Sequence, residues 1–140
     1  MTLHLLESGI FEYVDGCIVS PITSASLRLL NCTVDDLFSY ANSNTPELNP
    51  PKMLALEDAV FLTTMDGLYG ATAILYDGVL KEVSSVLQTP HFHILPISEH
   101  GVLCTNSLTL ERKKNLMMNE SAPLTKSVYE YSAGIVSMIP

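Results

Sequence analysis

Short runs of β-forming residues recur along the chain, and most of them come in pairs around a turn. Two of the pairs flank an Asp-Gly dipeptide, which is the strongest local signal for a β-hairpin. They are Ile10–Val14 with Cys17–Ser20 around Asp15-Gly16, and Ala59–Thr63 with Tyr69–Leu75 around Asp66-Gly67. A third pair, Phe92–Leu95 with Val102–Thr105, flanks a predicted turn at Pro96–Gly101, and Ser127–Tyr131 is predicted to be the last strand. The apolar tail Ile135–Pro140 has no clear assignment.

Between these runs, a helix is predicted over Val34–Asn42, where apolar residues recur at helical spacing. Thr33 is in the position of an N-cap, and Asp36 follows three residues later, where its charge suits the positive end of the helix. We expect Asn42–Pro51 to be a loop, because its three prolines lack backbone donors and favour an extended conformation in the residue before them.

Three further helices are predicted, at Ser24–Leu30, Gly78–Leu87 and Leu108–Met118. In Gly78–Leu87, for which Asp77 is the expected cap, the apolar residues form one stripe that includes Leu80. In the last helix we expect Leu108, Leu110 and Leu116 to face inward and Arg112, Lys113 and Lys114 to face solvent.

The order of elements predicts an α+β fold. Hairpins give antiparallel pairing, so we expect a mixed, largely antiparallel sheet with the helices packed on one face. A chain of 140 residues is the length of one domain, and 47% hydrophobic residues supply enough apolar surface for a core. We therefore predict a single domain over residues 1–140.

The cysteines and the amino-terminal segment predict a cytoplasmic location. Cys17, Cys32 and Cys104 are odd in number and widely spaced, which favours free, buried thiols in a reducing compartment. The first 20 residues contain no Lys or Arg, so they do not resemble a secretory signal. No stretch approaches about 18 consecutive apolar residues, which excludes a membrane-spanning helix.

The net charge of −8 is concentrated in the first part of the chain. Residues 1–60 contain eight acidic residues against Arg28 and Lys52, a net charge of −6, and residues 61–140 carry −2. An acidic surface repels phosphate, so direct nucleic-acid binding is disfavoured. The same surface can attract a protein with a basic surface, although the charge can also serve only to keep the domain in solution. The candidate binding residues are Asp35, Asp36, Glu57 and Asp58.

Histidines are concentrated near the predicted turn at Pro96–Gly101. His91 and His93 alternate on a strand and so face the same side, and together with His100 they form a weak candidate metal site, in which Glu99 would serve as the base. The alternative is that His91 lies in water and His93 packs against the core. The chain contains neither glycine-rich phosphate-binding motif, and we expect no cofactor.

The same turn contains a candidate acid–base pair, Glu99 and His100, with Ser98 beside it. No nucleophile stands out, because adjacency in sequence does not create an attack geometry. Cys104 is expected to be a core residue. An enzyme is therefore the less favoured interpretation.

Four stretches of the chain carry a family resemblance: Tyr69–Tyr76, Gly78–Val83, Phe92–Pro96 and Leu124–Tyr131. Through these stretches, the chain from Ser20 onward resembles a family of uncharacterised proteins from chromosomes and mobile elements of gut Firmicutes, which carry a domain of unknown function. Many members are longer at the amino terminus, so this chain resembles their carboxyl-terminal half. What the resemblance implies concerns the fold, since the activity of the family is unknown.

The family signature at the turn is Leu-Pro-Ser-Ser-Ile-His-Glu, and here it is degenerate. Ser98 matches the second Ser and His100 matches the His, but Ile97, Glu99 and Gly101 stand for Ser, Ile and Glu. Half of the polar set is absent, which lowers the expectation of catalysis at this turn.

Two classes of function follow from the sequence. The first is a small acidic protein-binding module of a mobile element or phage. By analogy with anti-CRISPR proteins, it would act as an inhibitor that covers the basic channel of a host defence nuclease. The second is a small hydrolase or metal-dependent enzyme centred on Pro96–Gly101. The sequence does not indicate the oligomeric state.

Overall fold

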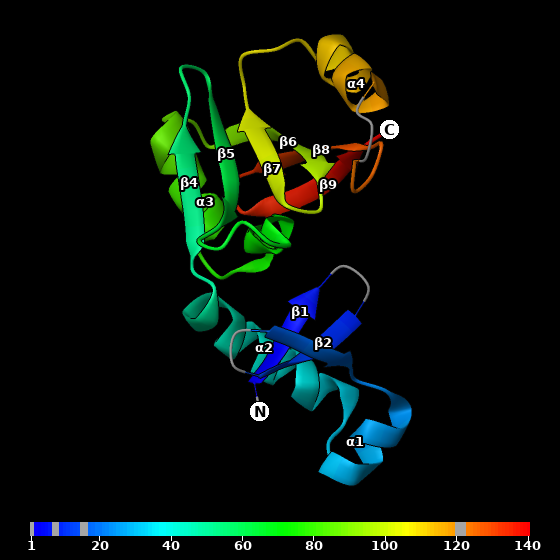
Figure 1. The fold of residues 1–140 in the computed structure, drawn as a ribbon. Coiled ribbons are helices and arrows are strands. Elements are labelled where there is room, and N and C mark those ends of the chain that lie inside the picture. Colours follow the sequence, from blue (N-terminus) through cyan, green and yellow to red (C-terminus); the bar gives the residue numbers. More distant parts are fainter. Residues whose placement is uncertain (1, 7–8, 15–16, 120–122) are drawn as a thin grey trace. The chain divides into compact units, whose positions relative to one another are not determined.

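The computed structural model describes residues 2–6, 9–14, 17–119 and 123–140 (Figure 1). The chain forms two compact units, residues 1–50 and residues 51–140, and each is described by itself. That the two units together make one domain stays a prediction. No helix among the described residues combines the length and the apolar character needed to cross a membrane.

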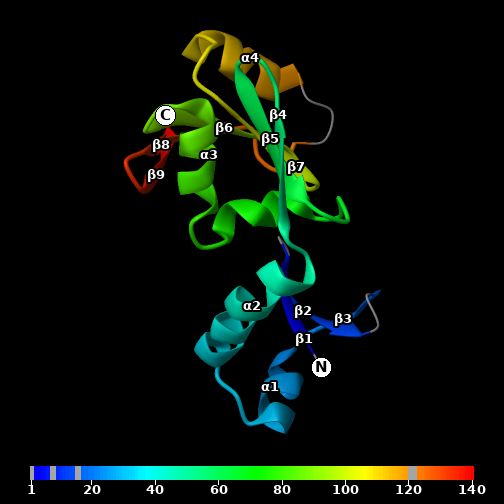
Figure 2. The same cartoon turned by 90° about the vertical axis from the view of Figure 1, so that its left-hand side faces the viewer.

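The first unit is a small antiparallel sheet with two helices (Figure 2). Its strands, in the order β1-β2-β3, are β1 (Thr2–Leu6), β2 (Gly9–Val14) and β3 (Cys17–Pro21). The β2–β3 pairing confirms the first predicted hairpin, whose Asp15-Gly16 turn lies outside the described residues. Helices α1 (Ser24–Leu30) and α2 (Val34–Leu48) follow, and α2 packs against β1. The prediction missed β1.

Helix α2 continues through Pro46 to Leu48, so the prediction of a loop from Asn42 is wrong. Leu37, Ala41 and Thr45 are all buried and lie four residues apart, on one face of the helix. This face extends past Asn42, and its packing offsets the backbone hydrogen bond that Pro46 cannot make. Proline therefore did not end the helix, because tertiary packing outweighed the local preference.

The second unit is built on a six-stranded sheet in which every pairing is antiparallel. The strand order is β4-β5-β7-β6-β8-β9. The strands are β4 (Pro51–Ala55), β5 (Ala59–Thr64), β6 (His91–Ser98), β7 (Gly101–Thr105), β8 (Val128–Ser132) and β9 (Ile135–Ile139). The predicted hairpin of β6 and β7 is confirmed, with longer strands and a shorter turn. The two edge strands, β4 and β9, were not assigned from the sequence.

The predicted strand at Tyr69–Leu75 is wrong, because Gly70–Leu75 forms a 3-10 helix, η1. Tyr69 has a left-handed backbone, with φ of 50°, which turns the chain away from an extended path. The first four residues of η1 are small and all buried, so the tight helix packs directly against β5 and β7. Strand β5 therefore pairs with β4 and β7 and not with this segment.

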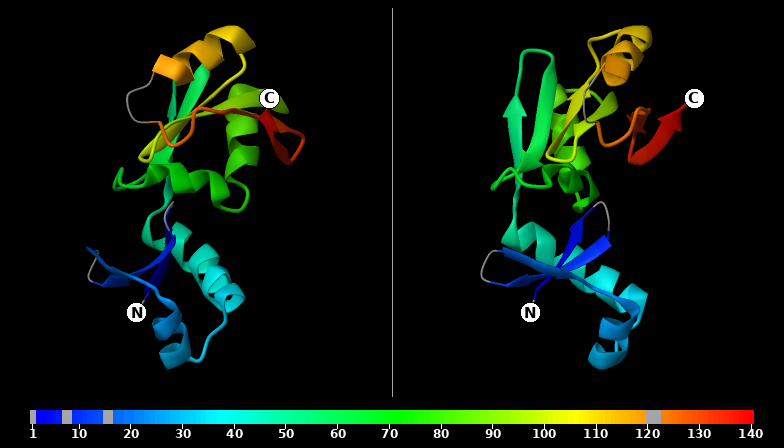
Figure 3. Two further views of the ribbon diagram at one scale, coloured as in Figure 1. Left: turned by 90° about the vertical axis from the view of Figure 1, so that its right-hand side faces the viewer. Right: turned by 45° about the vertical axis from the view of Figure 1, so that its right-hand side comes forward.

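Helices cover both faces of the sheet, so the expectation of helices on one face is wrong in this respect, while the α+β class and the antiparallel pairing are confirmed. Side chains from η1 and α3 (Val79–Leu87) form the larger core with Val60, Ile94 and Val102. On the other face, α4 (Leu110–Asn119) contributes Met117 to a smaller core with Leu95 and Val128. The helices α3 and α4 lie well apart in both views of Figure 3. Helix α3 begins after Gly78 and not after an Asp77 cap, because Gly78 adopts φ of 80°.

Candidate functional site

The tip of the β6–β7 hairpin, at Glu99 and His100, is joined to the start of η1 by hydrogen bonds. The backbone N–H of Tyr69 donates to His100 Nδ1 at 3.1 Å, and Thr63 Oγ1 donates to the His100 carbonyl oxygen at 2.6 Å. The N–H of Ala71 donates to the carbonyl oxygen of Glu99 at 3.2 Å. Residues 28 to 37 positions apart in the sequence are therefore held together at this end of the sheet.

Both imidazole nitrogens of His100 have a partner. Nδ1 accepts from Tyr69, so the proton of a neutral ring is on Nε2, which lies 3.3 Å from Glu99 Oε1. A general base needs a free lone pair directed at its substrate, and this ring has already used its lone pair on a backbone N–H. Ser98 Oγ accepts from the His100 backbone N–H at 3.1 Å. The structure thus brings Ser98, Glu99 and His100 together, in an arrangement that stabilises the left-handed Tyr69.

The three histidines of the candidate metal site are not brought together. His91 Nδ1 is 2.8 Å from Ser132 Oγ, and His93 Nδ1 is 2.6 Å from Lys113 Nζ. His100 is on the hairpin tip, at the opposite end of β6. Among the residues that the structure describes, no group of three or more His, Cys, Asp or Glu side chains is placed to hold a metal ion.

The most unusual polar group of the second unit is the ammonium of Lys113 on α4, whose side chain is 1% exposed. The sequence prediction placed it in solvent and Leu110 and Leu116 inside. The structure reverses this, because Lys113 and Met117, four residues apart, form the buried face, while Leu110 and Leu116 are 36% and 39% exposed. Lysine is almost never fully buried, so no sequence signal identified it.

Lys113 Nζ contacts His93 Nδ1 on β6 and the Thr105 carbonyl oxygen on β7, at 2.6 and 3.3 Å. Burial lowers the pKa of Lys113. Burial also lowers the pKa of His93, and the nearby Lys113 adds to this effect, while Glu130 on β8 opposes it. A neutral His93, whose Nδ1 accepts a hydrogen bond from the Lys113 ammonium, agrees with the lowered pKa of His93. An amine with a lowered pKa suits nucleophilic chemistry, but this one is covered by the protein and has no access to a substrate.

The four candidate binding acids are all exposed, but they differ in what they contact. Asp36 Oδ2 accepts from the Thr33 backbone N–H and hydroxyl at 2.9 and 2.7 Å, and these bonds lower the pKa of Asp36. Asp36 therefore caps α2. Asp35 lies beside it in the first unit, whereas Glu57 and Asp58 lie between β4 and β5 in the second. The four acids belong to two units and are not one established surface.

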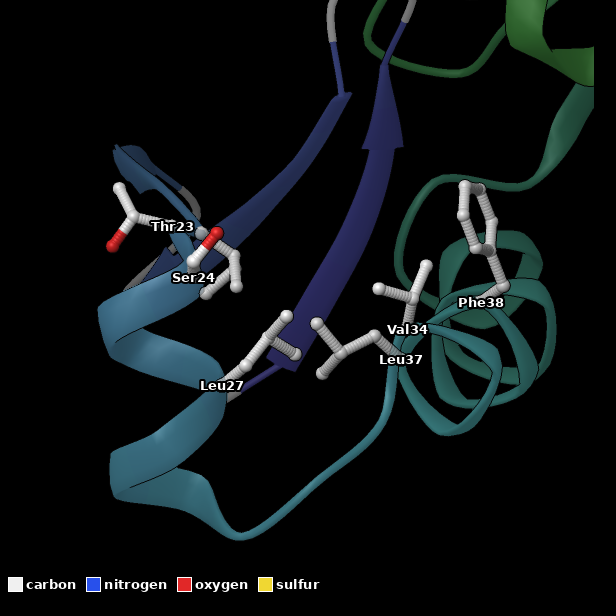
Figure 4. A pocket seen from close by; sticks show the side chains of 7 residues that line it. Thr23, Ser24, Leu27, Val34, Leu37 and Phe38 are labelled. Carbon is white, nitrogen blue, oxygen red and sulfur yellow. The ribbon is translucent and has the colours of Figure 1, made fainter.

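An open apolar groove of about 280 Å³ lies between α1 and the start of α2 (Figure 4). Leu27 from α1 and Leu37 from α2 point toward each other across it, and Val34 and Phe38 form its rim. Leu37 is buried, but Val34 and Phe38 are 51% and 43% exposed. Leu27 was predicted in one helix and Val34, Leu37 and Phe38 in the next, but no groove was predicted, because a groove requires the relative position of the two helices.

Comparison with protein-family models, with curated proteins and with solved structures finds no match to this chain. The resemblance to the Firmicutes family stays a prediction.

Proposed function

We propose that the chain is a protein-binding module whose groove between α1 and α2 takes a segment with apolar residues flanked by Lys or Arg. The observation that carries the proposal is the groove, with a buried apolar floor at Leu37 and an exposed apolar rim at Val34 and Phe38. Exposed apolar side chains that line a concavity are typical of an interaction site.

Charge supports a basic partner. Asp35 is exposed in the first turn of α2, next to Val34 on the groove rim. Residues 1–50, the unit that contains the groove, hold six acidic residues against Arg28, a net charge of −5. Exposed acids of this kind add little to folding, but they accelerate encounter with an oppositely charged surface and disfavour an acidic one.

The finer form of the proposal is an inhibitor of a host defence nuclease. The nucleic-acid channel of a nuclease is basic, and an acidic protein with an apolar contact surface has the complementary properties. The module would occupy the channel in the manner of an anti-CRISPR protein. An enzyme centred on Pro96–Gly101 has less support, because both nitrogens of His100 are already engaged.

The test uses two labelled amphipathic peptides with the same apolar positions, one with Lys and Arg on its polar face and one with Glu. Fluorescence anisotropy should show binding of the basic peptide only, and the affinity should fall as salt increases. Phe38→Ser should weaken binding at least tenfold. Leu29→Ser is the matched control, because Leu29 is 88% exposed on α1 but does not line the groove.

The acids are tested in the same assay. Asp35→Asn should weaken binding at low salt, whereas the double change Glu57→Gln and Asp58→Asn, on the other unit, should not. Asp36 is kept, because its replacement would also remove the hydrogen bonds that its carboxylate accepts from Thr33 in the capping box of α2. Equal binding of both peptides, or loss of binding in Leu29→Ser and not in Phe38→Ser, would overturn the proposal. His100→Ala should leave binding unchanged.

A further inference from the structure

Strand β9 is an edge of the six-stranded sheet and is unusually apolar for an edge. It pairs with β8 on one side, and no described strand pairs with its other side. Ile135, Val136 and Met138 are 71%, 45% and 59% exposed. An exposed edge offers a row of unpaired N–H and C=O groups, and proteins usually protect such an edge with charged residues or proline. No residue of Ile135–Ile139 is charged or proline.

The register of the β8–β9 hairpin determines which backbone groups point outward. The two strands are joined by Ala133 and Gly134, both with positive φ, and Ser132 is opposite Ile135. The residues that flank such a two-residue turn form a hydrogen-bonded pair, and hydrogen-bonded and non-hydrogen-bonded pairs then alternate along the ladder. Ile135, Ser137 and Ile139 therefore bond to β8, and the N–H and C=O groups of Val136 and Met138 point away from the sheet.

The sequence of β9 is close to a palindrome around Ser137. When a second β9 is placed antiparallel with Ser137 opposite Ser137, Val136 faces Met138 and Ile135 faces Ile139 of the other copy. The outward N–H and C=O groups of Val136 and Met138 are then opposite each other. Each such pair exchanges two hydrogen bonds, which gives four across the seam. A twofold axis brings the same surface of both copies together and closes the assembly.

The opposite edge of the sheet is less suited to this pairing. Strand β4 begins with Pro51 and carries Lys52, and both are features that disfavour edge-to-edge pairing. Each copy carries a net charge of −8, so two copies repel each other overall, and a seam without charged residues adds nothing to this repulsion. Strand β9 itself contains no charged residue, and the ammonium of Lys114 contacts the Pro140 carbonyl oxygen just beyond its end. Pairing of β9 with β4 would place Lys52 in the seam and leave further edges open.

We infer that β9 is an interaction surface for a second copy of this chain, in which two sheets join antiparallel at β9 about a twofold axis at Ser137. The inference is independent of the groove between α1 and α2, which lies in the other unit.

Sedimentation velocity over a wide range of concentration tests the pairing. The wild-type chain should move from monomer to dimer as concentration rises, without larger species. Met138→Lys should shift the midpoint of this transition at least tenfold to higher concentration, because it places two ammonium groups in the seam. Leu54→Lys on β4 is the matched control and should leave the transition unchanged. Far-UV circular dichroism should confirm that both variants fold.

A cross-link tests the register, in a chain with Cys17→Ser and Cys32→Ser. Opposite residues of a non-hydrogen-bonded antiparallel pair lie about 4.5 Å apart at Cα, within the range of a disulfide. Ser137→Cys should give a covalent dimer under mild oxidation, and Val136→Cys should give much less. A chain that stays monomeric at all concentrations would overturn the inference. So would open-ended oligomers that Leu54→Lys abolishes, since they would show pairing through β4.

Discussion

Replacing Lys113 with Met should stabilise the second unit, although it removes two hydrogen bonds. Met keeps an unbranched side chain of similar length, so the packing around Met117 and Leu95 is retained. The change removes the ammonium, and the effective cost of burying one ion in a protein is several kcal/mol. Its two hydrogen bonds, to His93 Nδ1 and to the Thr105 carbonyl oxygen, offset only part of that cost.

The balance depends on the acceptors that remain. His93 is half-buried, so water can reach its Nδ1 in the variant, and the Thr105 carbonyl lies in a paired strand. The penalty for unsatisfied acceptors is therefore small. We expect Lys113→Met to raise the free energy of unfolding by about 1–2 kcal/mol at pH 7. Lys113→Ala should lower it by about 2–4 kcal/mol, because truncation leaves a cavity beneath α4.

Urea unfolding followed by far-UV circular dichroism measures both effects, since the chain contains no Trp. With a slope of about 2 kcal/mol per M, the midpoint should rise by about 0.5–1 M in Lys113→Met, with an unchanged slope. In wild type, stability should also rise with pH as the lysine approaches its lowered pKa, because the unfolded chain then binds more protons. Lys113→Met should lose this rise. If Met and Ala destabilise the protein equally, the hydrogen bonds outweigh the burial cost and the reasoning fails.

Four further expectations concern stability. The pKa of His93 is lowered from 6.5, so the contribution of this group to the free energy of unfolding should be complete above pH 6.5 and should be lost as the pH falls below it. Thermal unfolding at several pH values would show this loss. His93→Gln should make the melting temperature less dependent on pH in this range. Leu62→Ala should lower the free energy of unfolding in urea by about 2–5 kcal/mol, and Leu80→Ala should lower it less, because Leu62 is fully buried and Leu80 only partly. Equal effects of the two changes would mean that the core is not centred on Leu62. Gly70→Ala should cost about 1–3 kcal/mol, since its Cβ would clash with Thr63 Oγ1 and with the His100 carbonyl oxygen. An unchanged melting temperature would argue against this close approach. Reductant should leave the unfolding midpoint unchanged, as Cys104 is a free, buried thiol, whereas loss of a disulfide would cost about 2–5 kcal/mol.

The sequence patterns correctly predicted those elements in which the local preference of the residues agrees with how the element packs in the folded chain. The α+β class, the hairpin of β6 and β7 and helix α3 are set by alternation, turn residues and one apolar stripe, and all three are confirmed. The errors lie where packing outweighed a local preference. Pro46 lies inside α2 because the buried face of the helix continues, and η1 replaced a strand because its small residues allow close packing.

The candidate site was less predictable than the fold. The proximity of Ser98, Glu99 and His100 follows from their adjacency, but their bonding depends on Tyr69, a residue far away in sequence. The burial of Lys113 and the groove beside Phe38 depend on how helices dock, which periodicity alone does not determine. The sequence identified the four candidate acids, but it did not show that Asp35 and Asp36 belong to one unit and Glu57 and Asp58 to the other.

The bonds from Tyr69 and Ala71 to the hairpin tip have a consequence for the order of folding. We expect them to close after β5, β7 and β6 have paired, because these strands bring Glu99 and His100 to η1. Interactions that form after the transition state slow unfolding and leave the folding rate unchanged. The hydrogen bond between Tyr69 and the His100 ring should therefore form after the transition state of folding. His100→Ala should then increase the unfolding rate with little effect on the refolding rate. In native-state hydrogen exchange, the amides of Tyr69 and Ala71 should open locally, well before the central strands.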